Sequence, residues 1–176
     1  MVDFRFEADE ILGEVVGRAG GIPGVVAIAT NREVDVYTGS AGRRSPNSTT
    51  AMSPDSVMLL ASCTKAITGV AVMQLVEEGA LVLKDPVKNY VPEIAEIPVL
   101  EGFKESGEPK LRAPKSDVTV EQLLLHTAGF GYDFLNADIL KYRTDNEIPS
   151  FMAATFSAIQ DVLLFDPGEQ WEYGTN

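Results

Sequence analysis

The stretch Ser62-Cys63-Thr64-Lys65 places a serine three residues before a lysine, at the junction of two apolar segments. The segment before it, residues 57–61, is an apolar, strand-like run, and residues 66–76 are apolar almost all round, as in a fully buried helix. A serine at the start of such a helix lies beside free backbone N–H groups, and a lysine three residues later lies on the same face. The spacing therefore predicts that Ser62 and Lys65 approach each other, an arrangement that activates a serine as a nucleophile.

Lys65 is the one charged residue between positions 57 and 76. An ammonium group in apolar surroundings is costly, so this lysine needs a partner or a purpose. Burial disfavours the charged form of a lysine, which would suit a proton acceptor. The four residues alone also fit a serine that caps a helix and is followed by a solvated lysine. The choice between a catalytic pair and a helix cap therefore depends on motifs elsewhere in the chain.

Composition excludes several classes of function. The net charge of −12 argues against nucleic acid as a partner, because phosphates would be repelled. No apolar run approaches the roughly 18 residues of a membrane span, and the N-terminus has no secretory signal, so we predict a cytoplasmic protein without a membrane partner. One cysteine and one histidine make neither a disulfide nor a conventional metal site, and we predict no metal and no cofactor.

Hydrophobic periodicity predicts further elements on both sides of the serine motif. Before it, the pattern predicts an amphipathic helix over 7–19 and a hairpin of strands over 25–29 and 34–37. After it, we expect a polar excursion over 98–117, a helix that begins at a capping box at Thr119, and a helix over 150–163. The predicted class is α/β (α+β): residues 1–84 hold the hairpin and the nucleophile helix, and residues 85–176 form a mostly helical subdomain that ends at a tyrosine motif.

Three separate motifs resemble those of the serine β-lactamases and penicillin-binding proteins. Residues 60–65 resemble the nucleophile motif of that superfamily, and residues 123–130 look like the Leu-Leu-x-His-Thr-Ser/Ala-Gly segment of its class C-like branch. Residues 165–173, Phe-Asp-Pro-Gly-Glu-Gln-Trp-Glu-Tyr, look like that branch's approach to its catalytic tyrosine. Residues 103–115 and 129–134 are closest to the esterase members, the family VIII carboxylesterases. The resemblance implies a β-lactamase/transpeptidase-like fold, with an antiparallel sheet flanked by helices and a helical subdomain.

The same resemblance implies catalytic roles for Ser62, Lys65 and Tyr173. Ser62 would form an acyl-enzyme, and either Tyr173 or Lys65 would take its proton; the sequence leaves open which of the two does so. Tyr173 is the branch's usual base, and a positive Lys65 would favour its phenolate.

Other residues of the same motifs are candidates for substrate binding or for structural roles. Trp171, Tyr132 and Phe134 are candidate substrate-binding residues, although Trp171 fits a structural role equally well. His126 lies at the end of a capped helix, and we interpret it as a structural residue that pins the following loop.

The chain departs from the family pattern in two respects. The lactamases and peptidases have Tyr-x-Asn, whereas Tyr173 is followed by Gly174 and Thr175, so that Asn176 comes one place late; esterase members often lack that Asn. Members of the family are also roughly twice as long as these 176 residues. We therefore expect this chain to be the N-terminal part of the fold, incomplete by itself, with a second chain or segment that supplies the remainder.

The leading functional interpretation is a serine carboxylesterase that cleaves short- to medium-chain acyl esters, with a small-molecule ester as substrate. An acyltransferase of the same mechanism, in which an alcohol replaces water, is the nearest alternative. A weak β-lactamase or D-amino-acid peptidase is another. A catalytically silent, ligand-binding member of the family is the remaining alternative, and the joint presence of Ser62, Lys65 and Tyr173 disfavours it.

Overall fold

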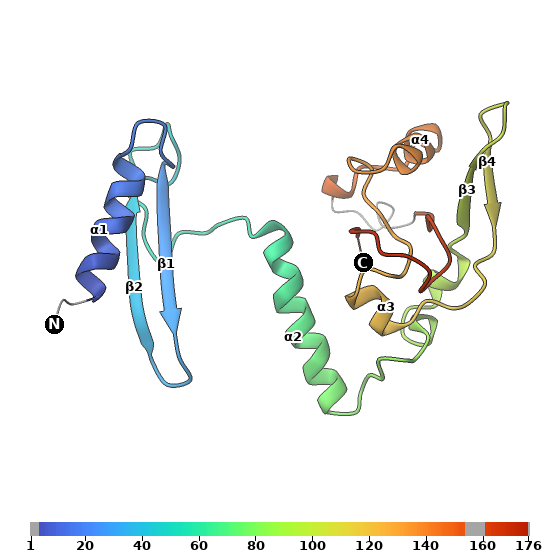
Figure 1. The fold of residues 1–176 in the computed structure, drawn as a ribbon, viewed down its shortest axis with the longest axis horizontal. Coiled ribbons are helices and arrows are strands. Elements are labelled where there is room, and N and C mark those ends of the chain that lie inside the picture. The colour runs from blue at the N-terminus through green and yellow to red at the C-terminus, as the bar shows by residue number, and fades with distance from the viewer. Residues whose placement is uncertain (1–3, 154–160, 176) are drawn as a thin grey trace. The chain divides into compact units, whose positions relative to one another are not determined.

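The computed structural model describes residues 4–153 and 161–175, and the chain divides into two compact units, Met1–Ala61 and Ser62–Asn176 (Figure 1). The first unit holds a helix and a hairpin, and the second holds all the other elements. In the described part of the chain, no helix is both long enough and apolar enough to cross a membrane.

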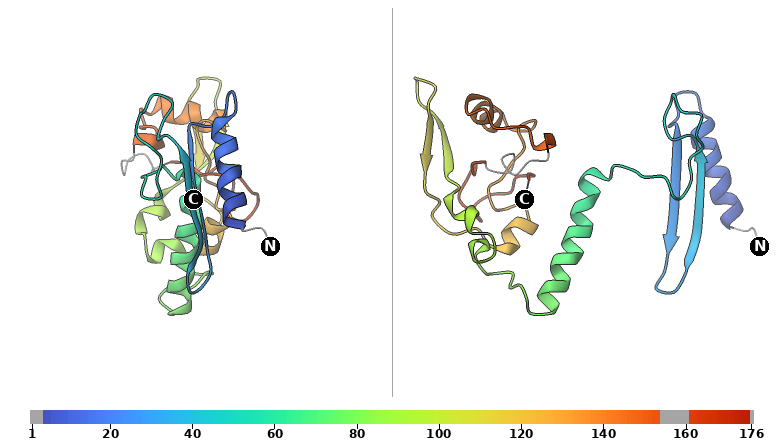
Figure 2. Two further views of the ribbon diagram at one scale, coloured as in Figure 1. Left: turned by 90° about the vertical axis from the view of Figure 1, so that its left-hand side faces the viewer. Right: turned by 180° about the vertical axis from the view of Figure 1, so that it is seen from behind.

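The first unit consists of one helix against a two-stranded antiparallel sheet (Figures 1 and 2). Helix α1, Phe4–Gly17, precedes strands β1, Gly24–Thr30, and β2, Asp35–Gly42. The strands pair in register from Gly24 with Gly42 to Ala29 with Tyr37. The Tyr37 hydroxyl donates to the Asp9 carboxylate at 2.7 Å and so ties the helix to the sheet. The predicted N-terminal helix and hairpin are confirmed.

The prediction of an apolar strand over residues 57–61 is wrong for this structure. The segment is irregular, and Val57 and Leu59 are 99% and 90% exposed. A strand needs a neighbouring backbone to pair its N–H and C=O groups, and none of the described residues supplies one here. The segment is apolar in composition, but its side chains are not buried among the described residues.

The serine motif begins a helix, as predicted. A single 3₁₀ turn, Ala61–Cys63, leads into α2, Thr64–Glu77, which ends where Gly79 adopts a φ of +74° and donates its N–H to the Val76 carbonyl. The predicted full burial of this helix is wrong: none of its residues is buried. Only Val72 packs against the core of the second unit, and several other apolar side chains are largely exposed, namely Ile67, Val70, Met73 and Leu75.

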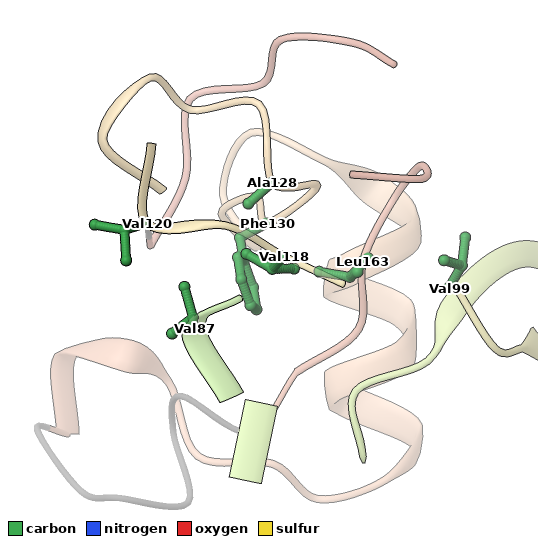
Figure 3. Close-up of a cluster of buried hydrophobic side chains, with 7 residues drawn as sticks. All are labelled: Val87, Val99, Val118, Val120, Ala128, Phe130 and Leu163. Carbon is green, nitrogen blue, oxygen red and sulfur yellow. The ribbon is translucent and has the colours of Figure 1, made fainter. Parts of the chain in front are cut away.

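The core of the second unit is a cluster of seven buried side chains (Figure 3). They come from segments far apart in the sequence, namely Val87, Val99, Val118, Val120, Ala128, Phe130 and Leu163. The 3₁₀ turns Val87–Asn89 and Pro92–Glu96 lead from α2 into this region. The cluster brings the segment around Phe130 next to the segment that leads to Tyr173.

Residues 98–117 are not the polar excursion that the sequence predicts. They form strands β3, Val99–Phe103, and β4, Pro109–Arg112, which pair antiparallel. Val99 and Leu100 are buried, because β3 also pairs with a distant segment: the Leu100 N–H donates to the Leu163 carbonyl, and the Leu163 N–H donates to the Pro98 carbonyl, both at 2.8 Å. A partner more than sixty positions away leaves no local signal.

The remaining helices are short. The capping box at Thr119 is confirmed and begins α3, Val120–Leu124; α4, Ala137–Asp145, is capped by the Asn136 side chain and was not predicted. The predicted helix over 150–163 is wrong at both described ends: residues 151–153 form a 3₁₀ turn and 161–163 are extended beside β3. Residues 154–160 of that prediction lie outside the described residues.

Candidate active site

Ser62 lies in the turn that immediately precedes α2. Its side chain is exposed, and its hydroxyl makes no hydrogen bond to any residue that the structure describes. The residue before it, Ala61, has a φ of +46°, a conformation that costs a non-glycine residue about 1 kcal/mol or more. Such strain is often found beside reacting groups. The structure thus presents Ser62 openly at a helix N-terminus, but it shows no contact between Ser62 and Lys65.

Lys65 is the second residue of α2, and its side chain reaches two tyrosines of the second unit. Its Nζ donates a hydrogen bond of 3.0 Å to the Tyr132 hydroxyl. The same nitrogen is 5.2 Å from the centroid of the Tyr173 ring. The sequence indicated that the Lys65 ammonium needs a partner. In the structure its partners are the two phenol side chains of Tyr132 and Tyr173.

The protonation of Lys65 differs from the expectation based on burial alone. Partial burial disfavours the charged form, but hydrogen bonds and charge interactions with Tyr132 and Tyr173 outweigh it, so that the pKa of Lys65 is raised above its ordinary value. Lys65 is therefore a cation at neutral pH. The expectation that burial lowers the pKa of Lys65 is therefore wrong, and the roles of Lys65 and Tyr173 in proton transfer stay predictions.

Tyr173 is held in place through His126. The Glu172 N–H donates to the His126 carbonyl at 3.0 Å, and the Gly174 N–H donates to His126 Nδ1 at 3.5 Å. The rings of His126 and Tyr173 are 4.8 Å apart, centroid to centroid. The structural interpretation of His126 gains support, but the segment that it pins is the later one that carries Tyr173.

Gly174, the residue after Tyr173, lies where two backbone segments approach closely. A Cβ atom at this position would come within 2.4 Å of the Phe130 carbonyl oxygen and 2.8 Å of the Gly131 Cα. Only glycine tolerates so close an approach of two backbones. The residue thus brings the Tyr173 segment against the segment that carries Tyr132, and the two rings lie 5.6 Å apart.

An ion pair fixes the start of the Tyr173 segment. Asp166 is buried, and both of its carboxylate oxygens accept hydrogen bonds of 2.7 Å from the Arg112 guanidinium on β4. The Lys115 N–H donates to the same carboxylate at 2.8 Å. These bonds, led by those from Arg112, hold the pKa of Asp166 far below its usual range. The turn that follows Asp166 is thereby anchored to the hairpin.

The three candidate substrate-binding residues lie in different surroundings. Trp171 is 64% exposed and meets the edge of the His126 ring, whereas Tyr132 is buried and engaged by Lys65. Phe134 is exposed and stacks on Tyr132 with centroids 4.8 Å apart. Sequence reasoning missed Phe151, whose ring lies 4.9 Å from that of Tyr132, because nothing in its local pattern indicates this contact. No group of described residues is arranged to hold a metal ion.

Protonation of His126 should destabilise the protein. Burial, assisted by the nearby Lys65 charge, lowers the pKa of His126 below its ordinary value of 6.5. The unfolded state then binds more protons, so stability is lost as pH falls through about 6.5. Because His126 is the only histidine in the sequence, urea unfolding at about pH 7.5 and 5.5 should show a larger loss for the wild type than for His126→Gln. An identical loss in the two proteins would contradict this assignment.

Comparison with known proteins shows which family the sequence matches. The sequence matches the family described as Beta-lactamase over residues 9–175. It is 34% identical over 168 residues to acyltransferase mokF of Monascus pilosus, which covers 90% of this chain and 40% of that protein. It is 35% identical over 163 residues to lovastatin esterase of Penicillium rubens, which covers 88% of this chain and 40% of that protein.

A solved structure agrees with this match. The unliganded structure of simvastatin synthase from Aspergillus terreus superimposes with a TM-score of 0.82 at 28% identity, over 99% of this chain and 46% of that one. The chain therefore spans less than half the length of these relatives.

Proposed function

The chain belongs to the beta-lactamase family, and on that basis we propose that it carries the nucleophile of a serine carboxylesterase that cleaves short- to medium-chain acyl esters. It has part of the β-lactamase/transpeptidase-like fold. One observation carries the proposal: the ammonium of Lys65, one turn after Ser62, lies against Tyr132 and Tyr173. A cation between two phenols beside a helix-terminal serine is suited to moving the proton of that serine.

In the proposed first step, Ser62 Oγ attacks the carbonyl carbon of the ester while Tyr173, as the phenolate, takes the hydroxyl proton. The bond from Oγ to the carbonyl carbon forms, and the bond from that carbon to the alcohol oxygen breaks. The departing alcohol takes the proton from Tyr173, and the acyl group remains on Ser62. The raised pKa of Lys65 supports this division of roles, because a lysine that stays charged stabilises the phenolate throughout.

In the second step a water oxygen bonds to the acyl carbon while Tyr173 takes a proton from the water. The bond from that carbon to Ser62 Oγ then breaks, Tyr173 returns the proton to Oγ, and the carboxylic acid leaves. The backbone N–H of Ser62, at the N-terminal end of α2, is suited to donate to the developing oxyanion. One donor is fewer than acyl-transfer enzymes normally provide, so the proposal requires a second donor from outside the described residues.

A second candidate function is acyl transfer to an alcohol. It is favoured by the names of the relatives, which include an acyltransferase and a synthase as well as an esterase. The chemistry of the first step is the same, and the acceptor of the second step differs. Phe134 and Trp171 expose ring surface on the two segments that carry the tyrosines, and this surface is suited to hold an apolar acyl or alcohol group.

We further propose that the remainder of the family fold covers α2, from the same polypeptide or from a second one. The support is the exposure of its apolar side chains, which in water costs about 25 cal/mol per Å² relative to burial. The remainder would also supply the second oxyanion donor.

A denaturing intact-mass spectrum of the active protein, with and without a serine-reactive phosphonate ester, tests these proposals together. We expect one adduct per active site, and peptide mapping should place it on Ser62. The same spectrum shows whether the labelled polypeptide extends beyond residues 1–176 or is accompanied by another. Heat-denatured protein is the control, because it should take no label.

Adding methanol or butanol to the ester assay separates the two candidate functions. A carboxylesterase should release mainly the free acid, and an acyltransferase should release mainly the new ester. A folded protein that takes no phosphonate label and turns over no ester would overturn both, and would favour the catalytically silent member of the family.

A further inference from the structure

Tyr132 has a contact that its candidate role in substrate binding does not explain. Its hydroxyl accepts the 3.0 Å hydrogen bond from Lys65 Nζ, and that nitrogen is 5.5 Å from the centroid of the Tyr132 ring. Because the phenol oxygen projects from the ring, a nitrogen with these two distances lies beyond the hydroxyl rather than against the ring face. The contact is therefore a charge-assisted hydrogen bond, the stronger kind.

The Tyr132 side chain is itself firmly held. It is only 7% exposed, and its ring is enclosed by those of Phe134, Phe151 and Tyr173 at centroid distances of 4.8, 4.9 and 5.6 Å. Its backbone carbonyl accepts hydrogen bonds from the N–H groups of residues 135 and 136. A side chain fixed on so many sides can fix whatever is bonded to it.

Lys65 has no comparable support from its own helix. A lysine side chain has four rotatable bonds, and α2 begins only one residue before it. The titratable groups around its ammonium are Tyr132, Tyr173 and His126, and the pKa of His126 is lowered partly by the Lys65 charge. Of the described residues, Tyr132 is the one to which Lys65 makes a hydrogen bond of short, well-defined geometry.

We propose that Tyr132 is a positioning residue, which holds the Lys65 ammonium beside Tyr173 through the hydrogen bond to its phenol oxygen. This inference rests on the proposed function, in which Tyr173 is the proton acceptor and Lys65 its stabilising charge. It assigns the two phenols different tasks: Tyr132 anchors the cation and Tyr173 exchanges the proton. Tyr132 would then contact the substrate little, if at all, because its hydroxyl is occupied by Lys65.

The assignment predicts a specific change in the pH dependence of activity. Without the Tyr132 hydroxyl, Lys65 loses an acceptor that favours its charged form, so the alkaline limb of the activity profile should move to lower pH. The profile therefore narrows from its alkaline side, which a general loosening of the structure would not produce.

The test compares Tyr132→Phe with Tyr142→Phe in the full-length protein. Tyr142 lies on α4 and makes no contact with Lys65, so it controls for the loss of a tyrosine hydroxyl. For Tyr132→Phe we expect kcat to fall about 10- to 100-fold with KM nearly unchanged and a narrowed profile, because a charge-assisted hydrogen bond is lost. Tyr142→Phe should match the wild type.

Direct titration of Lys65 separates this inference from the proposed function. In protein carrying isotope-labelled lysine, NMR follows the ε-carbon of Lys65, assigned by its absence in Lys65→Arg. Its pKa should fall in Tyr132→Phe and stay constant in Tyr142→Phe, whether or not the protein turns over any ester.

An unchanged Lys65 pKa in a folded Tyr132→Phe protein would overturn the positioning role, as would a rise in KM alone. If that variant does not fold, Phe134→Leu serves in its place. It keeps the hydroxyl but removes the stacked ring, and it should lower kcat and shift the Lys65 titration in the same direction; no shift there would equally overturn the role.

Discussion

Replacing Ser62 by alanine should abolish ester turnover, with a loss of about 10³-fold or more in kcat, and should remove the site of phosphonate labelling. The loss is large because the proposed route passes through a bond from Ser62 Oγ to the acyl carbon, and the alanine side chain has no atom that can form this bond. The fold should be unaffected, since Ser62 is exposed and its hydroxyl bonds to no described residue. Steady-state kinetics, intact mass and circular dichroism measure the three effects.

Cys63→Ala supplies the matched control for this substitution. Cys63 is the adjacent residue and is also exposed. Its replacement by alanine removes a side chain of similar size from the same turn. It should retain most of the activity and all of the labelling at Ser62. Ester hydrolysis at the wild-type rate in Ser62→Ala would contradict the acyl-enzyme mechanism, and it would do so most clearly if Cys63→Ala were the inactive variant.

The sequence predicted the elements whose signals are local. The hairpin that ends near Gly42, the start of α2 at the serine motif and the capping box at Thr119 all depend on residues within a few positions of one another. Periodicity and capping chemistry act over such distances, so a single sequence is enough to find them.

The failures involve residues whose partners are remote. Val99 is buried because β3 pairs with Leu163, and Leu163 is extended rather than helical for the same reason. Apolar residues of α2 and of residues 57–61 are exposed because the described residues do not cover them. Hydrophobicity indicates that a segment can be buried. It does not identify the distant segment that packs against it, because that depends on tertiary structure.

The candidate site shows the same division. The motifs around Ser62, Lys65 and Tyr173 could be singled out from sequence, but nothing local shows that Lys65 bonds to Tyr132, 67 positions away. The expected direction of the Lys65 pKa was wrong for that reason: burial and Tyr173 were foreseen, but the hydrogen bond to Tyr132 was not. A predicted pKa depends on every neighbour of a group, and the neighbours are a property of the fold.

A buried ion pair between Arg143 and Asp161 lies next to the segment that carries Tyr132. The Arg143 side chain donates to the Asp161 carboxylate at 2.5 Å and to the Pro149 carbonyl, and it lies 3.7 Å from the carboxylate of Asp133, the residue after Tyr132. The side chains of Arg143 and Asp161 are only 4% and 3% exposed. Burial raises the pKa of Asp161 and outweighs the opposing effect of Arg143, so the pair is held against a substantial desolvation cost.

Replacing Asp161 by asparagine should therefore lower the free energy of unfolding by about 3 kcal/mol or more, because it leaves the buried Arg143 charge without its nearest carboxylate. Urea unfolding of the full-length protein measures the change. The control is Asp145→Asn, which breaks the exposed Lys141–Asp145 pair on α4, the helix that carries Arg143. This substitution should lower the free energy of unfolding by about 1 kcal/mol at most. The double variant Arg143→Met with Asp161→Leu should recover part of the loss, since neither member of the Arg143–Asp161 pair then remains buried without the other. Equal effects of Asp161→Asn and Asp145→Asn would show that the buried pair contributes no more to stability than a surface pair.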